Sequence, residues 1–446
     1  MSIKLLLYLY ILFVASVSIL SYKKGCYLVW LTVLLFPPII LYMETKIKIP
    51  FIHVLMLTSV LLELRYYKNR LLYGGFIVQH QKAIFFYFTF TLCIVLMSQT
   101  VPILTQFKLF INEIIILLFA LQTFLIVTNN RTVAVVLLIM VCCIILFNFL
   151  YFLYFEMYLG MNPAGKPLYM ALNITDNDFL VDMIDSERGI MDFRAQTVYG
   201  HPLSLGQYML ILLPVFFLRN NNIKLVLMGM ALILIIASGT RGALVPSILI
   251  LIIGLIRSTH HLFLKTIIGI TIIIVGLSIM PTRTWKIINE QAEPFAAGLM
   301  FWDENKQTET NIGGSSMSMR FDQWEAAQDE ISNNPLMGRG LGYREWWQTK
   351  HNGLHPSLLG YESLLIYYLV ERGWLGLILF FLMTFYIYFV FKKKTSTPYI
   401  LKLIFVGYVI SIIMTGVRPF SFLLVCLASS IVCGIYPKQR NLLARG

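Results

Sequence analysis

The chain has 446 residues, of which 58% are hydrophobic and only 13% charged, and its mean hydropathy is +0.76. A soluble domain cannot bury that much apolar surface, so the composition excludes a soluble globular protein and indicates one surrounded by lipid. The formal net charge of +13 is no sign of nucleic-acid binding, because the basic residues lie mainly in short turns between apolar runs. Nucleic acid is not expected as a partner.

Apolar runs of about 15 to 22 residues, long enough to cross a bilayer as helices, recur along nearly the whole chain. About thirteen lie near residues 3–21, 27–43, 50–65, 83–103, 109–128, 133–155, 202–218, 224–238, 242–256, 264–281, 373–391, 399–417 and 420–436. The predicted fold is all-α, a polytopic transmembrane protein with about 12 to 13 spans and a large extracytoplasmic loop. No small-residue cleavage pattern follows the first run, so we expect an uncleaved helix.

The basic residues fall on one side of the membrane if the spans alternate, and this side is the cytoplasm by the positive-inside rule. Lys392 to Lys394 and the tail from Lys438 to Arg445 are examples. Lys46 and Lys48 break the rule, and thirteen spans would leave the N-terminus outside. The N-terminal orientation, and the choice between 12 and 13 spans, therefore stay open.

This topology divides the chain into five parts. Residues 1–155 and 357–446 hold the N-terminal and C-terminal transmembrane helices, and residues 202–281 hold further helices with a hairpin at Arg241. Two longer polar loops, residues 156–201 and 282–356, lie on the outer side. All six cysteines lie in or beside apolar runs, so neither disulfides nor zinc sites are expected.

Two arginines and a histidine are expected at the outer membrane surface. Arg241 joins two apolar runs with almost no linker, and such an arginine normally meets an anion, either a carboxylate or a lipid phosphate. Arg194 and His201 precede the run at 202–218. For His201, an ordinary surface role is as consistent with the sequence as a functional one.

The large loop contains five of the seven tryptophans, among them Trp324, Trp346 and Trp347. Two uses fit the pattern and can coexist: stacking on sugar rings, or a small folded cap and interfacial belt that pack on their own aromatics. Within the loop, residues 318–331 have the spacing of a short amphipathic helix that carries Arg320 in its first turn. Gly338 to Gly342 follow it and favour a tight turn over a nucleotide-binding loop.

After the loop, His355 opens a predicted short helix or half-span that runs to Gly376. Glu362, Glu371 and Arg372 lie near or inside apolar runs, as does Glu113 far earlier in the chain. Charges at such positions are functional or paired by default. The sequence does not divide them between these two roles.

The order of these motifs resembles the O-antigen ligase and polymerase superfamily of bacterial membrane glycosyltransferases. The similarity covers about residues 190–380: an Arg followed by Gly-His-Pro, a Ser-Gly-Thr-Arg-Gly hairpin, Arg-x-x-x-Trp at Arg320, Asn-Pro-x-x-Gly-x-Gly at Asn334, and a histidine before Glu-x-Gly-x-x-Gly at Glu371. The chain departs from the family pattern with Pro356 after His355 and with Ser204 after His201-Pro202, which leaves the role of each histidine open.

The resemblance implies transfer of a glycan from an undecaprenyl diphosphate carrier to an acceptor glycan at the periplasmic face of the bacterial inner membrane, without a nucleotide sugar or cofactor. The leaving diphosphate must be stabilised, and Arg194, Arg241 and Arg320 are the expected metal-free clamp. His355 is the expected general base, with His201 and Glu362 as secondary candidates. Attack opposite the diphosphate would invert the anomeric configuration.

Three functions remain open from the sequence. A polymerase of O-antigen, capsule or exopolysaccharide repeats is favoured, a ligase that transfers the glycan to lipid A core or a protein is the first alternative, and a flippase of lipid-linked glycans is the second. The charges gather at one face, whereas a flippase needs them distributed through the helices. The repeat-unit sugars and a chain-length-regulating partner are not indicated by the sequence.

Overall fold

The computed structural model describes residues 3–35, 50–98, 100–159, 162, 194–218, 223–258, 317–351, 363–418 and 420–438. These segments are mostly helical, and within them no β-strand occurs; Thr395 and Pro437 form an isolated bridge. The prediction of an all-α membrane protein is confirmed. Five described helices are long and apolar enough to cross a membrane, and six shorter apolar helices accompany them.

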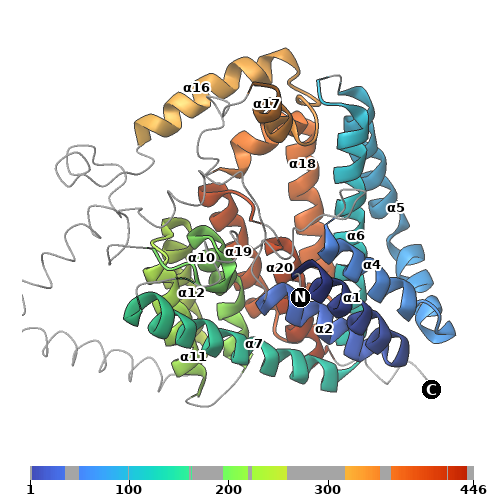
Figure 1. Cartoon of the computed structure of the whole chain (residues 1–446), viewed down its shortest axis with the longest axis vertical. Helices are drawn as coiled ribbons and strands as arrows, with labels where there is room; N and C mark the ends of the chain where they lie inside the picture. Colours follow the sequence, from blue (N-terminus) through green and yellow to red (C-terminus); the bar gives the residue numbers. More distant parts are fainter. Residues whose placement is uncertain are drawn as a thin grey trace, which may run out of the picture.

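The N-terminal half consists of α1 (Ile3–Leu20), α2 (Tyr22–Leu35), α4 (Phe51–Glu63), α5 (Tyr67–Met97), α6 (Ile103–Thr128) and α7 (Arg131–Tyr151), which continues as a π-helix, η1 (Phe152–Tyr158). The second half consists of the short 3-10 helix η2 (Thr197–Tyr199), α10 (Pro202–Leu212) with η3 (Leu213–Leu218), α11 (Ile223–Ala237), α12 (Arg241–Ser258), α16 (Met317–Asn333), α17 (Tyr343–His351), α18 (Leu364–Lys392), α19 (Pro398–Thr415) and α20 (Ser421–Ile435). Figure 1 shows α16 and α17 together beside α18, with α5 and α6 next to them.

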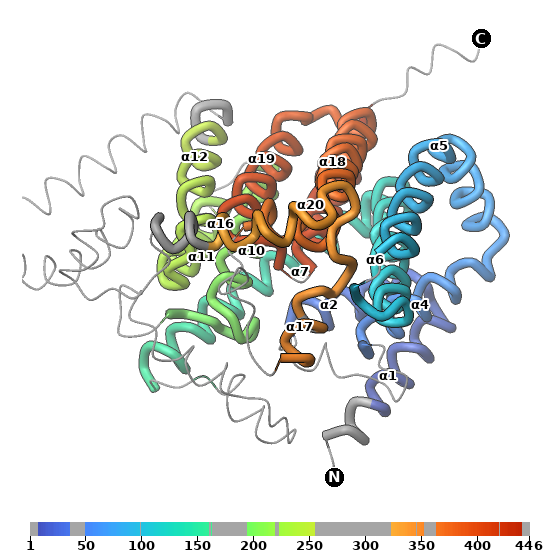
Figure 2. The backbone as a smooth tube through the Cα atoms, turned by 90° about the horizontal axis from the view of Figure 1, so that it is seen from above, coloured from blue at the N-terminus to red at the C-terminus, as the bar shows by residue number. Residues whose placement is uncertain are grey.

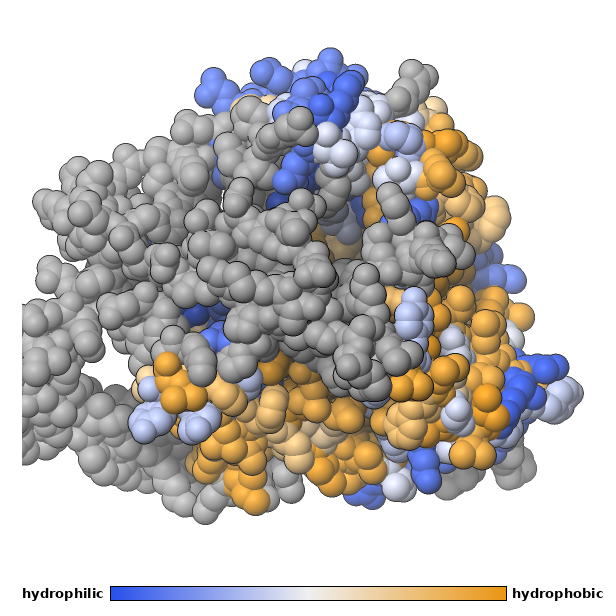
Figure 3. Space-filling view, in the orientation of Figure 1, coloured by the Kyte–Doolittle hydropathy of each residue, from blue (hydrophilic) through white to orange (hydrophobic). Residues whose placement is uncertain are grey.

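Helix α20 is the centre of the packing. It is buried along almost its whole length, and it contacts α6, α7, α10 and α19. In the view from above, α18, α19 and α6 lie beside it, and α5 lies farther out than α6 (Figure 2). Hydrophobic side chains cover the flanks of the bundle, whereas hydrophilic ones gather over α16 and α17 (Figure 3). This distribution is the one that a lipid environment requires, because no hydrogen bonds are available there for polar side chains.

The bundle has two ends: the loop end, where the segment around Arg339 lies, and the lysine end, where Lys394 and Lys438 lie. At the loop end, Ser98 donates a hydrogen bond to the carbonyl of Arg339, and Gln207 donates to that of Gly416. At the lysine end, the amide of Lys438 donates to the carbonyl of Lys394, and the Tyr436 hydroxyl donates to that of Leu218. Helices α18, α19 and α20 therefore each run from one end of the bundle to the other.

Two predicted boundaries are wrong for local reasons. Helix α5 begins at Tyr67, not near residue 83. Adding a residue to an existing helix costs little free energy, so the more polar residues before 83 extend the span as helix. The break between α5 and α6 falls before Pro102, since proline disfavours helical geometry in the residue that precedes it. The helix predicted over 318–331 is confirmed as α16.

Candidate active site

The structure brings Arg194, His201, Arg241 and Arg418 together at the loop end. The Arg194 Nε donates to the carbonyl of Ser238 at 2.8 Å, three residues before Arg241 at the start of α12. A β-carbon on Gly242 would lie 2.3 Å from Thr415 Cγ2, so α12 begins against the end of α19, just before Arg418. Three cationic side chains and three helix N-termini, those of α10, α12 and α20, thus share one small region.

The sequence did not lead us to Arg418, although its position resembles that of Arg241. It lies in the short link between two apolar runs. The amide nitrogen of Arg418 donates to Gln207 Oε1 at 3.2 Å, and its guanidinium donates to the carbonyl of Thr415 at 3.2 Å. The charges of Arg418 and Arg194 both act on the ring of His201, which places the two arginines near it.

His201 has a defined tautomer and charge. Its Nδ1 accepts the amide proton of Leu203 at 3.1 Å and so caps helix α10, which leaves the proton of the neutral ring on Nε2. Burial first, and then the positive charges of Arg418 and Arg194, hold the pKa of His201 well below its usual value. The ring is therefore neutral at physiological pH and offers one N–H donor beside two guanidinium groups.

This depressed pKa predicts a pH dependence of stability. The unfolded chain binds a proton at His201 near pH 6.5 and the folded chain does not, so stability should fall as the pH drops below about 6.5, with a slope of up to about 1.4 kcal/mol per pH unit. Unfolding midpoints of the wild type and of a His201→Asn variant, which keeps a capping side chain, measure this directly. A difference between the two that does not change from pH 7.5 to pH 5 would contradict the assignment.

A buried carboxylate, Glu156, holds the segment that carries Arg194 and His201. It accepts the amide of Thr197 at 2.8 Å and that of Gln196 at 3.2 Å. Thr197 has a positive φ of 48°, which is costly for a β-branched residue. Its hydroxyl donates to Asn148 at 2.6 Å, so side chains of α7 and η1 maintain this strained turn.

Glu371 holds the turn from Gly338 to Gly342, called the glycine loop below, in the same way. The amide of Gly342 donates to Glu371 Oε2 at 3.2 Å and that of Arg344 to Oε1 at 3.4 Å, at the N-terminus of α17, where the helix dipole favours a negative charge. Backbone bonds add to this contact: Arg339 and Gly340 donate to the carbonyls of Val370 and Glu371 at 2.8 and 2.9 Å. The predicted tight turn is confirmed, and the anion that its amides approach is a side chain of the protein itself.

The turn requires glycine at the positions where the sequence has it. Gly338, Gly340 and Gly342 have φ of 70°, 112° and 76°. Helix α18 bends where the loop packs on it, at Gly373 with φ 62°, and a β-carbon there would lie 2.4 Å from the carbonyl of Leu336. The short helix predicted before residue 373 is thus joined to the following span through this bend.

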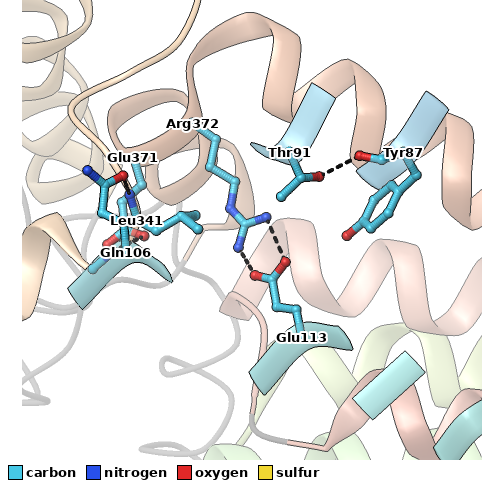
Figure 4. A network of polar contacts seen from close by, with 8 residues as sticks. Tyr87, Thr91, Gln106, Glu113, Leu341, Glu371 and Arg372 are labelled. Carbon is cyan, nitrogen blue, oxygen red and sulfur yellow. Dashed lines mark hydrogen bonds and ion pairs between the residues drawn. The ribbon is translucent and has the colours of Figure 1, made fainter. Parts of the chain in front are cut away.

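Figure 4 shows the polar contacts that join α6 to this bend. The Gln106 side chain accepts the amide of Leu341 at 3.1 Å. Seven residues further along α6, Glu113 forms a two-pronged ion pair with Arg372, whose guanidinium lies over the Tyr368 ring at 4.9 Å. The structure thus divides the charges that the sequence left undivided: Arg372 and Glu113 pair with each other, and Glu371 binds backbone amides.

The contacts of the glycine loop predict a selective effect on hydrogen exchange. Replacing Glu371 with glutamine removes a charged acceptor, so exchange of the Gly342 and Arg344 amides should accelerate by about 10- to 100-fold, as expected for a hydrogen bond of about 1.5–3 kcal/mol. The matched variant Glu156→Gln should accelerate exchange at Gln196 and Thr197 instead. Equal exchange patterns in the two variants would contradict separate anchoring of the two segments.

The tryptophans of the large loop differ in their surroundings. Trp346 stacks on Tyr343 at 5.8 Å between ring centroids, and both pack with Val101 and Val370. Trp347 stacks on His351 at 4.1 Å. The Trp324 side chain is 37% exposed, and the buried face of α16 is formed by its neighbours.

The remaining candidates lie outside the described residues. His355 and Glu362 fall in the segment 352–362, and of Arg320 only the backbone is described, in the first turn of α16. Within the described ranges, no three His, Cys, Asp or Glu side chains are grouped closely enough to hold a metal ion.

Comparisons with known proteins agree with the sequence resemblance. Residues 225–381 match the family model described as O-antigen ligase, a range that contains Arg241, the glycine loop and Glu371. An uncharacterized protein of Haemophilus influenzae is 27% identical over 208 residues, which is 44% of this chain and 50% of that protein. The match therefore spans half of the relative's length.

Proposed function

Starting from an O-antigen ligase family domain at residues 225–381 of a helical membrane protein, we propose that the chain transfers glycan from an undecaprenyl diphosphate carrier to an acceptor glycan. The product is a polymer of O-antigen, capsule or exopolysaccharide repeats, made at the periplasmic face of the bacterial inner membrane. The observation behind this proposal is a cationic cluster at one end of the bundle: Arg194 and Arg418 act on His201, and Arg241 begins α12 three residues after the carbonyl that Arg194 contacts.

In the reaction, the bond between the anomeric carbon and the diphosphate oxygen breaks, and the acceptor hydroxyl oxygen bonds to that carbon. Negative charge grows on the leaving diphosphate, and forked guanidinium donors on a fixed backbone stabilise it. The Nε2 proton of neutral His201 adds a further donor. Because its Nδ1 already accepts the Leu203 amide, His201 is a poor base, which favours His355 for removal of the hydroxyl proton.

The aromatic residues of α16 and α17 have separate roles in this proposal. Trp346 and Trp347 pack within the loop, so they support the cap that lies over the loop end. Trp324 is the exposed one of the three and is the candidate to stack on a sugar ring. Arg320 lies four residues before Trp324 in the sequence and remains a candidate for a further contact to phosphate.

Reconstitution in liposomes tests the function. Purified protein is given undecaprenyl diphosphate-linked repeats alone or with lipid A core, and the glycan products are separated by size. A ladder of repeats from the carrier substrate alone supports the polymerase, and transfer only when the core is added supports the ligase. Absence of any covalent product, together with movement of the lipid-linked glycan across the bilayer, would replace both by a transporter.

A further inference from the structure

A cavity of about 260 Å³ lies between α5, α6 and α18, with α20 as its floor. Its walls are almost entirely hydrocarbon and include Phe88, Leu121, Phe124 and Phe391. It extends from Phe422, in the first turn of α20, to Phe391 near the lysine end of α18. The function proposed above does not use it.

The apolar lining suits a hydrocarbon chain and not water. A water molecule in a cavity needs two to four polar partners, and this lining provides almost none. Helix α5, which forms one side, is largely exposed along its length and would face lipid. An acyl chain from the surrounding leaflet can therefore enter between α5 and its neighbours without crossing polar surface.

The polar groups near the cavity gather at the lysine end. The His80 Nδ1 and the Tyr386 hydroxyl form a hydrogen bond of 2.5 Å at the cavity wall. Lys393 and Lys394 act electrostatically on His80, and with Lys392 they are exposed at the end of α18. The amide of Lys438 bonds to the carbonyl of Lys394 and so adds a fourth lysine. The apolar cavity and a basic rim, formed by Lys392, Lys393, Lys394 and Lys438, are thus adjacent.

We propose that this cavity binds one acyl chain of an anionic phospholipid from the leaflet at the lysine end, with the lipid phosphate held by Lys393 and Lys394. The charge complementarity of the rim selects an anionic phospholipid over a zwitterionic one. The bound lipid fills the gap between α5 and the rest of the bundle and fixes α5, whose other end contacts the glycine loop through Ser98. The inference is independent of the proposed glycan transfer.

Native mass spectrometry of the purified, delipidated protein tests this with added phosphatidylglycerol and phosphatidylcholine. Wild type should retain one phosphatidylglycerol with clear preference, and Lys393→Gln with Lys394→Gln should reduce that preference by about fivefold for each lysine. Leu121→Trp fills the cavity and should reduce retention of both lipids. Ile111→Trp, ten residues away on the same helix, 37% exposed and outside the cavity, should retain lipid as wild type does.

Equal retention by Leu121→Trp and wild type, or no preference between the two lipids, would overturn the proposal. So would displacement of phosphatidylglycerol by an equal concentration of undecaprenyl diphosphate, which would assign the cavity to the carrier. Should Leu121→Trp fail to fold, phosphatidylglycerol with a photoreactive group on its acyl chain is cross-linked to wild type. Labels on cavity residues support the site, and labels spread evenly over exposed residues such as Leu104 contradict it.

Discussion

Replacing Arg418 with alanine is expected to lower the rate of glycan transfer by at least about 100-fold, the typical effect of losing one preorganised donor to a developing negative charge. The backbone contact of Arg418 with Gln207 survives this change, so the fold should persist apart from the lost bond to the carbonyl of Thr415. Arg418→Lys should recover only part of the rate, because an ammonium cannot bind two phosphate oxygens as a guanidinium fork does.

Arg131→Ala is the matched control for this prediction. Arg131 is an exposed arginine at the start of α7, and it lies at the lysine end, far from the cluster that contains the partly buried Arg418. Rates are compared in liposomes at equal protein content, with thermal unfolding of each variant measured alongside. Unchanged transfer by a stable Arg418→Ala protein would remove Arg418 from the site.

Breaking the ion pair between Arg372 and Glu113 should produce the largest loss of stability. The Arg372 side chain is only 10% exposed, so Glu113→Leu alone leaves a buried, uncompensated charge, and a cost of about 3–5 kcal/mol is expected. Arg372→Met alone should cost a similar amount. The double variant Glu113→Leu with Arg372→Met should be much closer to wild type, because no charge then remains to be compensated.

Thermal unfolding of the four proteins in the same detergent measures this coupling. A fall in apparent Tm of about 6–10 °C is expected for each single variant, with most of it restored in the double variant. Additive losses would mean that the two charges do not depend on each other. Since the pair joins α6 to the bend of α18, we also expect faster proteolysis of the glycine loop in the single variants only.

The sequence was sufficient for the features that depend on local pattern. Hydrophobic runs predicted the helices, the spacing of residues 318–331 predicted α16, and the position of Arg241 between two runs indicated a cation at a helix end. Each of these follows from residues that are neighbours in the chain, where helical periodicity and the cost of a charge in lipid decide the result.

Contacts between distant segments could not be derived in this way. Arg372 and Glu113 are 259 residues apart, and the amide of Arg418 meets a side chain 211 residues earlier. Which carboxylate meets a guanidinium and which meets backbone amides depends on how the helices pack. Arg418 differs in this respect, because the rule applied to Arg241 would have identified it.

Binding of undecaprenyl diphosphate tests whether Arg194, Arg241 and Arg418 form a diphosphate clamp. Affinities of purified wild type for undecaprenyl diphosphate and undecaprenyl monophosphate are compared with those of the three arginine-to-alanine variants and of Arg131→Ala. Wild type and Arg131→Ala should bind the diphosphate more tightly, and each cluster variant should reduce this preference by about 10-fold or more, as for charge-assisted hydrogen bonds of about 1.5–3 kcal/mol. Equal binding of the two lipids by wild type, or a preference that survives all three substitutions, would contradict the clamp.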